Sequence, residues 1–312
     1  MRDARAAGVP VRTIYRAEAA RELVRLAKAA FASAEAWGAA GPWDRFRMAS
    51  VAFGLGAADH VFLNGPSAQA VLGLPTLSEP PTVPVAIRLA PTVSGTNLSG
   101  HARVRTGFLP ARHRWAKDRV RVVSAGYAAI DVARHSTAVE ALAVVDHALH
   151  TGASREQLAA LLEDLRTYPG IQQAKWAVGH GDERAESPLE SLGRLSFIEA
   201  SRVAPLSNVW FSDGVAAYRV DHYFPDSGVV LEGDGGLKVN NRPDAHRVVQ
   251  RQVRRESWLR AQGCAVERYD YPMAIGRRAQ IVALVDRAAR SQAGRALPTC
   301  WSLEPPRHLR IA

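Results

Sequence analysis

Three carboxylates and a lysine lie close together in the last third of the sequence. Asp221 stands in one short run of β-branched and aromatic residues, Glu232 and Asp234 end the next run, and Lys238 follows. The turn-forming segment 225–228 separates the two runs, so the local pattern predicts a β-hairpin. Because side chains alternate along a strand, we expect Glu232 and Asp234 on one face, with Asp221 in the same region of the sheet.

Clustered carboxylates repel one another unless a cation lies among them. Oxygen ligands suit Mg²⁺ and Mn²⁺, and burying several carboxylates without a cation costs several kcal/mol. An acidic residue at a strand end beside a turn is common, but that explanation accounts for one carboxylate and not for three. We therefore predict that Asp221, Glu232 and Asp234 bind Mg²⁺ or Mn²⁺.

A predicted helix begins shortly before this hairpin. Ser187, Pro188 and Glu190 occupy the N-cap, first and third positions of that helix, which is the pattern of a capping box. Glu190 could therefore serve only to satisfy backbone N–H groups.

The order of Glu190, Asp221, Glu232-Gly-Asp234 and Lys238 resembles the PD-(D/E)xK nuclease superfamily, in particular the branch of very-short-patch-repair endonucleases. The resemblance runs from about residue 183 to residue 290, and segments 254–259 and 263–268 are similar to that branch's closing helix and strand. It implies a restriction-endonuclease-like fold, with a mixed central sheet flanked by helices, and Mg²⁺-dependent cleavage of DNA.

The same resemblance implies catalytic roles. Asp221 and Glu232 would hold the metal, and Asp234 and Glu190 would complete or orient its shell. The lysine of the family's motif is absent from Glu232-Gly-Asp234, so Lys238 is the candidate for the cation that stabilises the transition state. A solvated loop lysine is the alternative interpretation of Lys238.

A helix predicted over residues 244–262 is rich in arginine. Arg251, Arg254 and Arg255 fall near one of its faces. Such a face is usually solvated, but beside a metal site it would follow DNA phosphates.

The N-terminal segment predicts a second DNA contact. Residues 4–16 read as a short helix, a glycine turn and a second helix, which is the pattern of a helix-turn-helix. The second helix would present four residues to a major groove: Arg12, Thr13, Tyr15 and Arg16. This stretch resembles the winged helix of AbiEi-type antitoxins, with residues 22–28 at the position of the wing. The alternative is one amphipathic helix over residues 17–37.

The middle of the chain, residues 43–177, continues the resemblance to those antitoxins, which implies a toxin or another protein as a partner. Apolar runs predict strands at 83–89 and 120–123, and helices are expected at 136–150 and 154–166, the latter opened by a capping box. The polar segment 90–103 reads as a connection. We find no catalytic constellation here.

Composition sets the outer limits. The 312 residues exceed the usual size of one core, and we divide them into parts at 1–35, 36–178, 179–295 and a proline-containing tail at 296–312. A net charge of +10 favours a polyanionic partner, and two cysteines argue against a disulfide framework or a thiolate metal site. Without a long apolar run or signal peptide, we expect a cytoplasmic protein that makes no membrane contact.

The sequence therefore predicts an α/β DNA-binding protein with a Mg²⁺- or Mn²⁺-dependent endonuclease domain. The alternative is a catalytically inactive, AbiEi-like antitoxin or transcriptional repressor that uses the nuclease fold as a scaffold.

Overall fold

The computed structural model describes residues 2–89, 95–99, 102–235 and 245–309. The protein is mixed α/β, and its chain divides into two compact units, Met1–Gly181 (unit 1) and Asp182–Ala312 (unit 2). Across the described ranges, none of the helices is long and apolar enough to cross a membrane.

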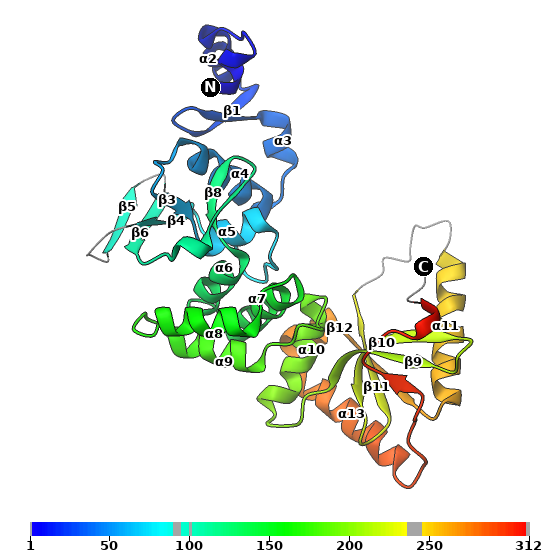
Figure 1. The fold of residues 1–312 in the computed structure, drawn as a ribbon. Helices are drawn as coiled ribbons and strands as arrows, with labels where there is room; N and C mark the ends of the chain where they lie inside the picture. Colours follow the sequence, from blue (N-terminus) through cyan, green and yellow to red (C-terminus); the bar gives the residue numbers. More distant parts are fainter. Residues whose placement is uncertain (1, 90–94, 100–101, 236–244, 310–312) are drawn as a thin grey trace. The chain divides into compact units, whose positions relative to one another are not determined.

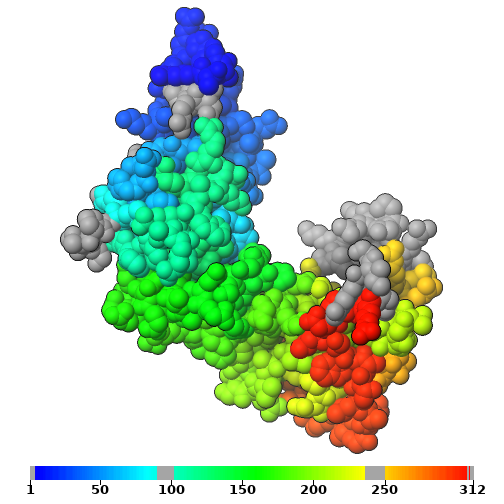
Figure 2. Space-filling view, in the orientation of Figure 1, coloured from blue at the N-terminus to red at the C-terminus, as the bar shows by residue number. Residues whose placement is uncertain are grey.

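Unit 1 begins with two short helices and a β-hairpin, α1 (Arg2–Ala6), α2 (Val11–Ala19), β1 (Leu23–Ala27) and β2 (Ala30–Ser33). Gly8 has a φ of +73°, a conformation that glycine adopts readily and that turns the chain between the helices. Strands β1 and β2 pair in antiparallel fashion, with Val24 opposite Ala32. The alternative of one helix over residues 17–37 is therefore wrong. Figure 2 shows these elements, in blue, at one end of unit 1.

A six-stranded mixed sheet forms the centre of unit 1, in the order β5-β6-β4-β3-β8-β7. Its strands are β3 (Val61–Leu63), β4 (Val85–Leu89), β5 (Gly95–Ser99), β6 (Ala102–Gly107), β7 (Arg114–Lys117) and β8 (Val120–Val123). The predicted strands at 83–89 and 120–123 are confirmed. The polar segment 90–103 is not only a connection, because β5 lies within it and pairs with β6. An edge strand such as β5 tolerates polar residues, since only one of its sides is paired.

Helices complete unit 1: α3 (Ala34–Ala39), α4 (Pro42–Gly56), α5 (Gly65–Leu72), the 3₁₀ turn η1 (Ala111–His113), α6 (Ala125–Ala133), α7 (Ala138–His150), α8 (Arg155–Asp164) and α9 (Ile171–His180). Residues of β8, α6, α7, α8 and α9 share one buried core, which includes Val122, Tyr127, Val144 and Leu161. The capping box of Ser154 and Gln157 at the start of α8 is confirmed.

Unit 2 is built on a five-stranded mixed sheet in the order β12-β11-β10-β9-β13. Its elements are α10 (Pro188–Glu199), β9 (Leu206–Ser212), β10 (Ala217–Phe224), β11 (Val229–Asp234), α11 (Ala245–Ala261), β12 (Ala265–Asp270), α12 (Tyr271–Gly276), α13 (Arg278–Gln292), β13 (Trp301–Ser302) and the 3₁₀ turn η3 (Arg307–Leu309). The predicted hairpin of β10 and β11 is confirmed, with Tyr223 opposite Val230. Figure 1 shows α11 on one side of the sheet and α10 and α13 on the other.

The apolar residues of the sheet explain this layering. Leu259 of α11 packs with Val209, Phe211 and Val220 in one buried cluster. The predicted tail also joins the fold, because Trp301 of β13 pairs with Phe211 of β9 at the edge of the sheet.

Candidate active site

Three of the predicted carboxylates lie together in unit 2. Glu190 is on the first turn of α10, Asp221 is on β10 and Glu232 is on β11. The side chains of Glu190 and Glu232 are buried, and Asp221 is half-buried. In the antiparallel hairpin His222 lies opposite Leu231. The next position on each strand is Asp221 and Glu232, so the same register brings these two residues together.

Asp221 and Glu232 are electrostatically coupled. The backbone N–H of Gly233 donates to Asp221 Oδ2 at 2.8 Å. Burial raises the pKa of Asp221. Burial, and then the charge of Asp221, raises the pKa of Glu232 to about 7. Two acids that share one partly dehydrated site favour a cation or a proton between them.

Arg255 places a positive charge against Glu232. Its Nη2 donates to Glu232 Oε1 at 2.7 Å and also to the backbone oxygen of Arg219. The Arg255 side chain therefore points toward Glu232, whereas those of Arg251 and Arg254 on the same helix are exposed to solvent. Its charge lowers the pKa of both Asp221 and Glu232, but less than burial raises them.

Glu190 acts as a cap in this structure. Its carboxylate accepts hydrogen bonds from the backbone N–H of Glu186 at 3.0 Å, from Ser187 Oγ at 2.7 Å and from Asn208 Nδ2 at 2.6 Å. Burial raises its pKa, and the charge of Asp221 adds to the effect. The carboxylate therefore ties the start of α10 to β9 while remaining within electrostatic reach of Asp221.

A buried histidine and tyrosine lie beneath the cluster. Tyr269 Oη donates to the backbone oxygen of Leu189 at 2.9 Å and lies 3.0 Å from His222 Nε2. Since the hydroxyl proton is used toward Leu189, Nε2 carries the hydrogen in the bond to Tyr269. Full burial lowers the pKa of His222 to about 3, so the ring is neutral. A Cβ on Gly193 of α10 would lie 2.2 Å from Tyr269 Oη, which explains the glycine at that position.

The remaining predicted members of the site are placed differently. Asp234 ends β11 with its side chain 46% exposed, and its Oδ2 lies 3.8 Å from Arg268 Nη1. Lys238 lies outside the described residues. In the part of the chain that the structure describes, no three His, Cys, Asp or Glu side chains form one metal-binding group. The three-ligand arrangement of Asp221, Glu232 and Asp234 is therefore not assembled there.

A two-carboxylate site still fits a hard divalent ion. Mg²⁺ is commonly held by one or two protein carboxylates together with water and substrate phosphates. Asp221 and Glu232 are oxygen donors, they are adjacent, and each has a pKa that burial raises. These two residues, and not Asp234 or the fully hydrogen-bonded Glu190, are the ones that would hold the ion.

The predicted DNA-contacting residues are mostly exposed. On α11, Arg251 and Arg254 are exposed, whereas Arg255 is half-buried against Glu232. On α2, the four predicted residues Arg12, Thr13, Tyr15 and Arg16 are exposed and Ile14 is buried between them. Arg25 of the β1–β2 hairpin stacks over the Tyr15 ring at 5.5 Å, which joins the hairpin to this surface.

Several residues around the carboxylates escaped the sequence interpretation. Asn208 binds Glu190, Tyr269 supports His222, and Arg255 binds Glu232, a contact that the spacing along α11 did not predict. His222, a polar residue in an apolar run, was the available signal for the buried pair. Comparison with protein-family models and with curated proteins finds no match for this sequence.

Proposed function

We propose that unit 2 hydrolyses phosphodiester bonds in DNA, with Mg²⁺ or Mn²⁺ held by Asp221 and Glu232. The observation that carries this proposal is the pair of adjacent carboxylates, one buried and one half-buried, whose pKa values are raised despite the ion pair of Glu232 with Arg255. Such a pair binds a divalent cation in exchange for its protons. A bound Mg²⁺ would activate a water molecule and neutralise charge that develops on the phosphate.

The residues around the pair have distinct roles in this proposal. Arg255 neutralises Glu232 and is placed to contact a phosphate once the carboxylate binds a cation. Glu190 is a positioning residue that fixes the start of α10 through Ser187 and Asn208. Lys238 follows β11 in the sequence and supplies the cation that stabilises the transition state.

DNA binding completes the proposed function. The exposed Arg251 and Arg254 of α11 would contact phosphates, and the exposed surface of α2 would contact a major groove. The net charge of +10 supports attraction to DNA.

A catalytically inactive antitoxin or repressor is the second candidate. The ion pair of Arg255 with Glu232 favours this second candidate. An arginine can balance the charge of a buried carboxylate without a metal ion, and a scaffold needs no metal for catalysis. A toxin or another protein would then be the partner. A cleavage assay on duplex and single-stranded DNA with Mg²⁺ or Mn²⁺ separates the two functions: cleavage supports the nuclease, and its complete absence supports the scaffold.

We expect Mn²⁺ to raise the melting temperature of the native protein but not that of Glu232→Gln. A ligand that binds only the folded state stabilises it by mass action, and the substitution removes one of two carboxylate ligands. Differential scanning calorimetry with and without Mn²⁺ measures the shift. Glu163→Gln, which changes an exposed carboxylate of unit 1, should behave as the native protein does. Equal shifts in the native protein and Glu232→Gln would contradict the assignment.

The metal-free protein should lose stability through Glu232 as the pH rises. The folded-state pKa of about 7 is above the ordinary value of 4.5, so the folded protein holds a proton that the unfolded chain releases. The contribution of Glu232 to the free energy of unfolding is complete at low pH, and it decreases by about 2 kcal/mol between about pH 5 and about pH 7. Urea unfolding of the native protein and Glu232→Gln isolates the effect, because the other titrating groups contribute to both. A free-energy difference that does not change with pH would contradict it.

Salt dependence tests the arginines of α11. Arg251→Ala combined with Arg254→Ala should flatten the log–log slope of DNA affinity against salt concentration by about two, near one for each lost phosphate contact. Fluorescence anisotropy at several salt concentrations measures the slope. The matched control removes two exposed arginines of α13, Arg287 and Arg290, and should leave the slope unchanged. The same flattening in both double variants would show that net charge, and not α11, determines the affinity.

A further inference from the structure

A pocket of about 550 Å³ lies within unit 1. Its size is in the range of small-molecule sites. Residues of α4, α5, β4, β6, α6 and α7 line it, together with the segment between α5 and β4. Apolar side chains form part of the wall, including Pro66, Val83, Val85 and Val132.

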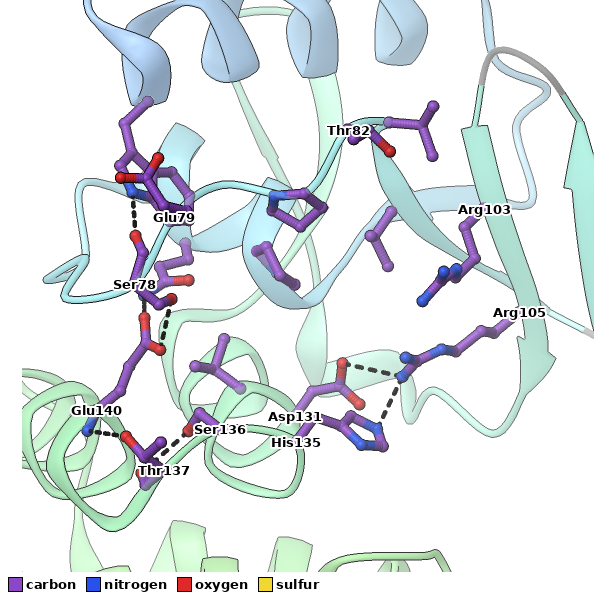
Figure 3. Close-up of a pocket in the computed structure, with 17 residues that line it drawn as sticks. Ser78, Glu79, Thr82, Arg103, Arg105, Asp131, His135, Ser136, Thr137 and Glu140 are labelled. Carbon is purple, nitrogen blue, oxygen red and sulfur yellow. Dashed lines mark hydrogen bonds and ion pairs between the residues drawn. The ribbon is translucent and has the colours of Figure 1, made fainter.

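The polar groups of the pocket are divided by charge. Arg103 and Arg105 are two residues apart on β6, so both side chains leave the same face of the strand. Figure 3 shows these arginines on one side of the pocket and Ser78, Glu79 and Glu140 on the other. The pocket thus offers cations at one end and hydrogen-bond acceptors at the other.

The nearby carboxylate of Asp131 does not neutralise the positive charge of Arg103 and Arg105. Asp131 accepts from Arg134 Nη1 at 2.9 Å and from Asn64 Nδ2 at 3.1 Å, whereas Arg105 Nη1 is 3.7 Å from its Oδ2. Arg105 Nη1 instead lies 2.9 Å from His135 Nε2. An arginine can only donate, so this nitrogen of His135 accepts and the ring is neutral. Burial lowers the pKa of His135, in agreement with a neutral ring. Arg103 and Arg105 therefore face the pocket as two guanidinium groups beside one compensated carboxylate.

Hydrogen bonds link the side chains at the opposite end of the pocket. Glu140 Oε2 accepts from Ser78 Oγ at 2.8 Å, and its Oε1 accepts from Gln69 Nε2 at 3.0 Å. Trp43 Nε1 donates to the backbone oxygen of Ser78 at 2.7 Å, which holds the indole ring at the pocket wall. The exposed Glu79 adds a carboxylate at this end. An aromatic ring, apolar walls and acceptors suit a planar, apolar group that carries a hydrogen-bond donor.

From this division of charge we propose that the pocket binds a nucleoside monophosphate whose base carries an exocyclic amine. The phosphate would lie against Arg103 and Arg105, because guanidinium groups match phosphate oxygens in two-pronged hydrogen bonds. The base would lie along the apolar wall toward Trp43, with its amine toward Glu79. A single phosphate group carries up to two negative charges, which balances the two arginines.

Isothermal titration of the full-length protein with AMP, adenosine and inorganic phosphate tests the site. We expect AMP to bind at least about tenfold more tightly than either fragment, since only AMP carries both a phosphate for the arginines and a base for the opposite wall. Arg103→Ala should weaken AMP binding by about tenfold or more, which is the effect of losing one charge-assisted contact. Arg103 is exposed, so the variant should fold, and its melting temperature without ligand checks this.

Two controls locate the binding. Arg166→Ala removes an exposed arginine elsewhere in unit 1 and should leave AMP affinity unchanged. Asp221→Asn in unit 2 should also leave it unchanged, so this result does not depend on the nuclease proposal. The proposal is overturned if AMP does not bind, if Arg103→Ala binds AMP as the native protein does, or if a zwitterionic dipeptide binds while AMP does not.

Discussion

If unit 2 is the nuclease we propose, Asp221→Asn is expected to lower the single-turnover rate of DNA cleavage by on the order of a thousandfold. The substitution keeps the size of the side chain but removes a charge from the adjacent pair formed with Glu232. The lost interaction acts on the charge that develops in the transition state, so affinity for DNA should change little. Rapid mixing with excess enzyme and a labelled duplex separates the rate from binding.

Asp226 provides the matched control for that measurement. It lies in the turn between β10 and β11 and is exposed, so Asp226→Asn alters the same hairpin without touching the carboxylate pair. This variant should cleave at the native rate. An Asp221→Asn protein that cleaves as fast as the native one would remove Asp221 from the mechanism. A native protein that cleaves neither duplex nor single strand with Mg²⁺ or Mn²⁺ would leave the scaffold function.

Gly193→Ala is expected to destabilise the protein by roughly 3 kcal/mol, because the added methyl group overfills a packed site. A Cβ at this position would lie 2.2 Å from Tyr269 Oη and 2.8 Å from His222 Nε2, and both side chains are buried. Urea unfolding followed by circular dichroism measures the loss. The second variant, Gly193→Ala with Tyr269→Phe, removes the nearest clashing atom and should recover part of the stability.

Gly179 of α9 is the control for the glycine prediction. Beyond its own helix backbone and its two chain neighbours, no described atom lies within 4 Å of a Cβ built on it. Gly179→Ala should therefore stabilise the protein by up to about 1 kcal/mol, which is the usual gain from alanine within a helix. Equal effects at residues 179 and 193 would contradict the packing around Tyr269.

Parts of the fold were predictable because short-range chemistry determines them. The turn at 225–228 between two β-rich runs identified the hairpin of β10 and β11, and Ser154 with Gln157 marked the start of α8. The N-terminal hairpin was more ambiguous. Leu23 to Ser33 suits either a helix or two short strands, and pairing between β1 and β2 together with packing against α4 decides for strands.

The composition of the candidate site depended on contacts between residues far apart in the sequence. Alternation along β11 placed Glu232 and Asp234 together, but Asp234 is paired with Arg268 at the end of its strand. Helical spacing grouped Arg255 with Arg251 and Arg254, but packing of α11 turns Arg255 to Glu232. The unit 1 pocket was missed for the same reason, since Arg105 and His135 come from separate elements.

Local sequence was enough to predict the hairpin that sets Asp221 beside Glu232 and the cap formed by Ser187 and Glu190, because turns and caps involve neighbouring residues. Only long-range packing could show that Glu190 and Glu232 are buried and Asp221 half-buried, that Arg255 pairs with Glu232, and that the pKa of Glu232 is raised to about 7. Burial and long-range electrostatics depend on which distant segments meet, and no local pattern of residues contains that information.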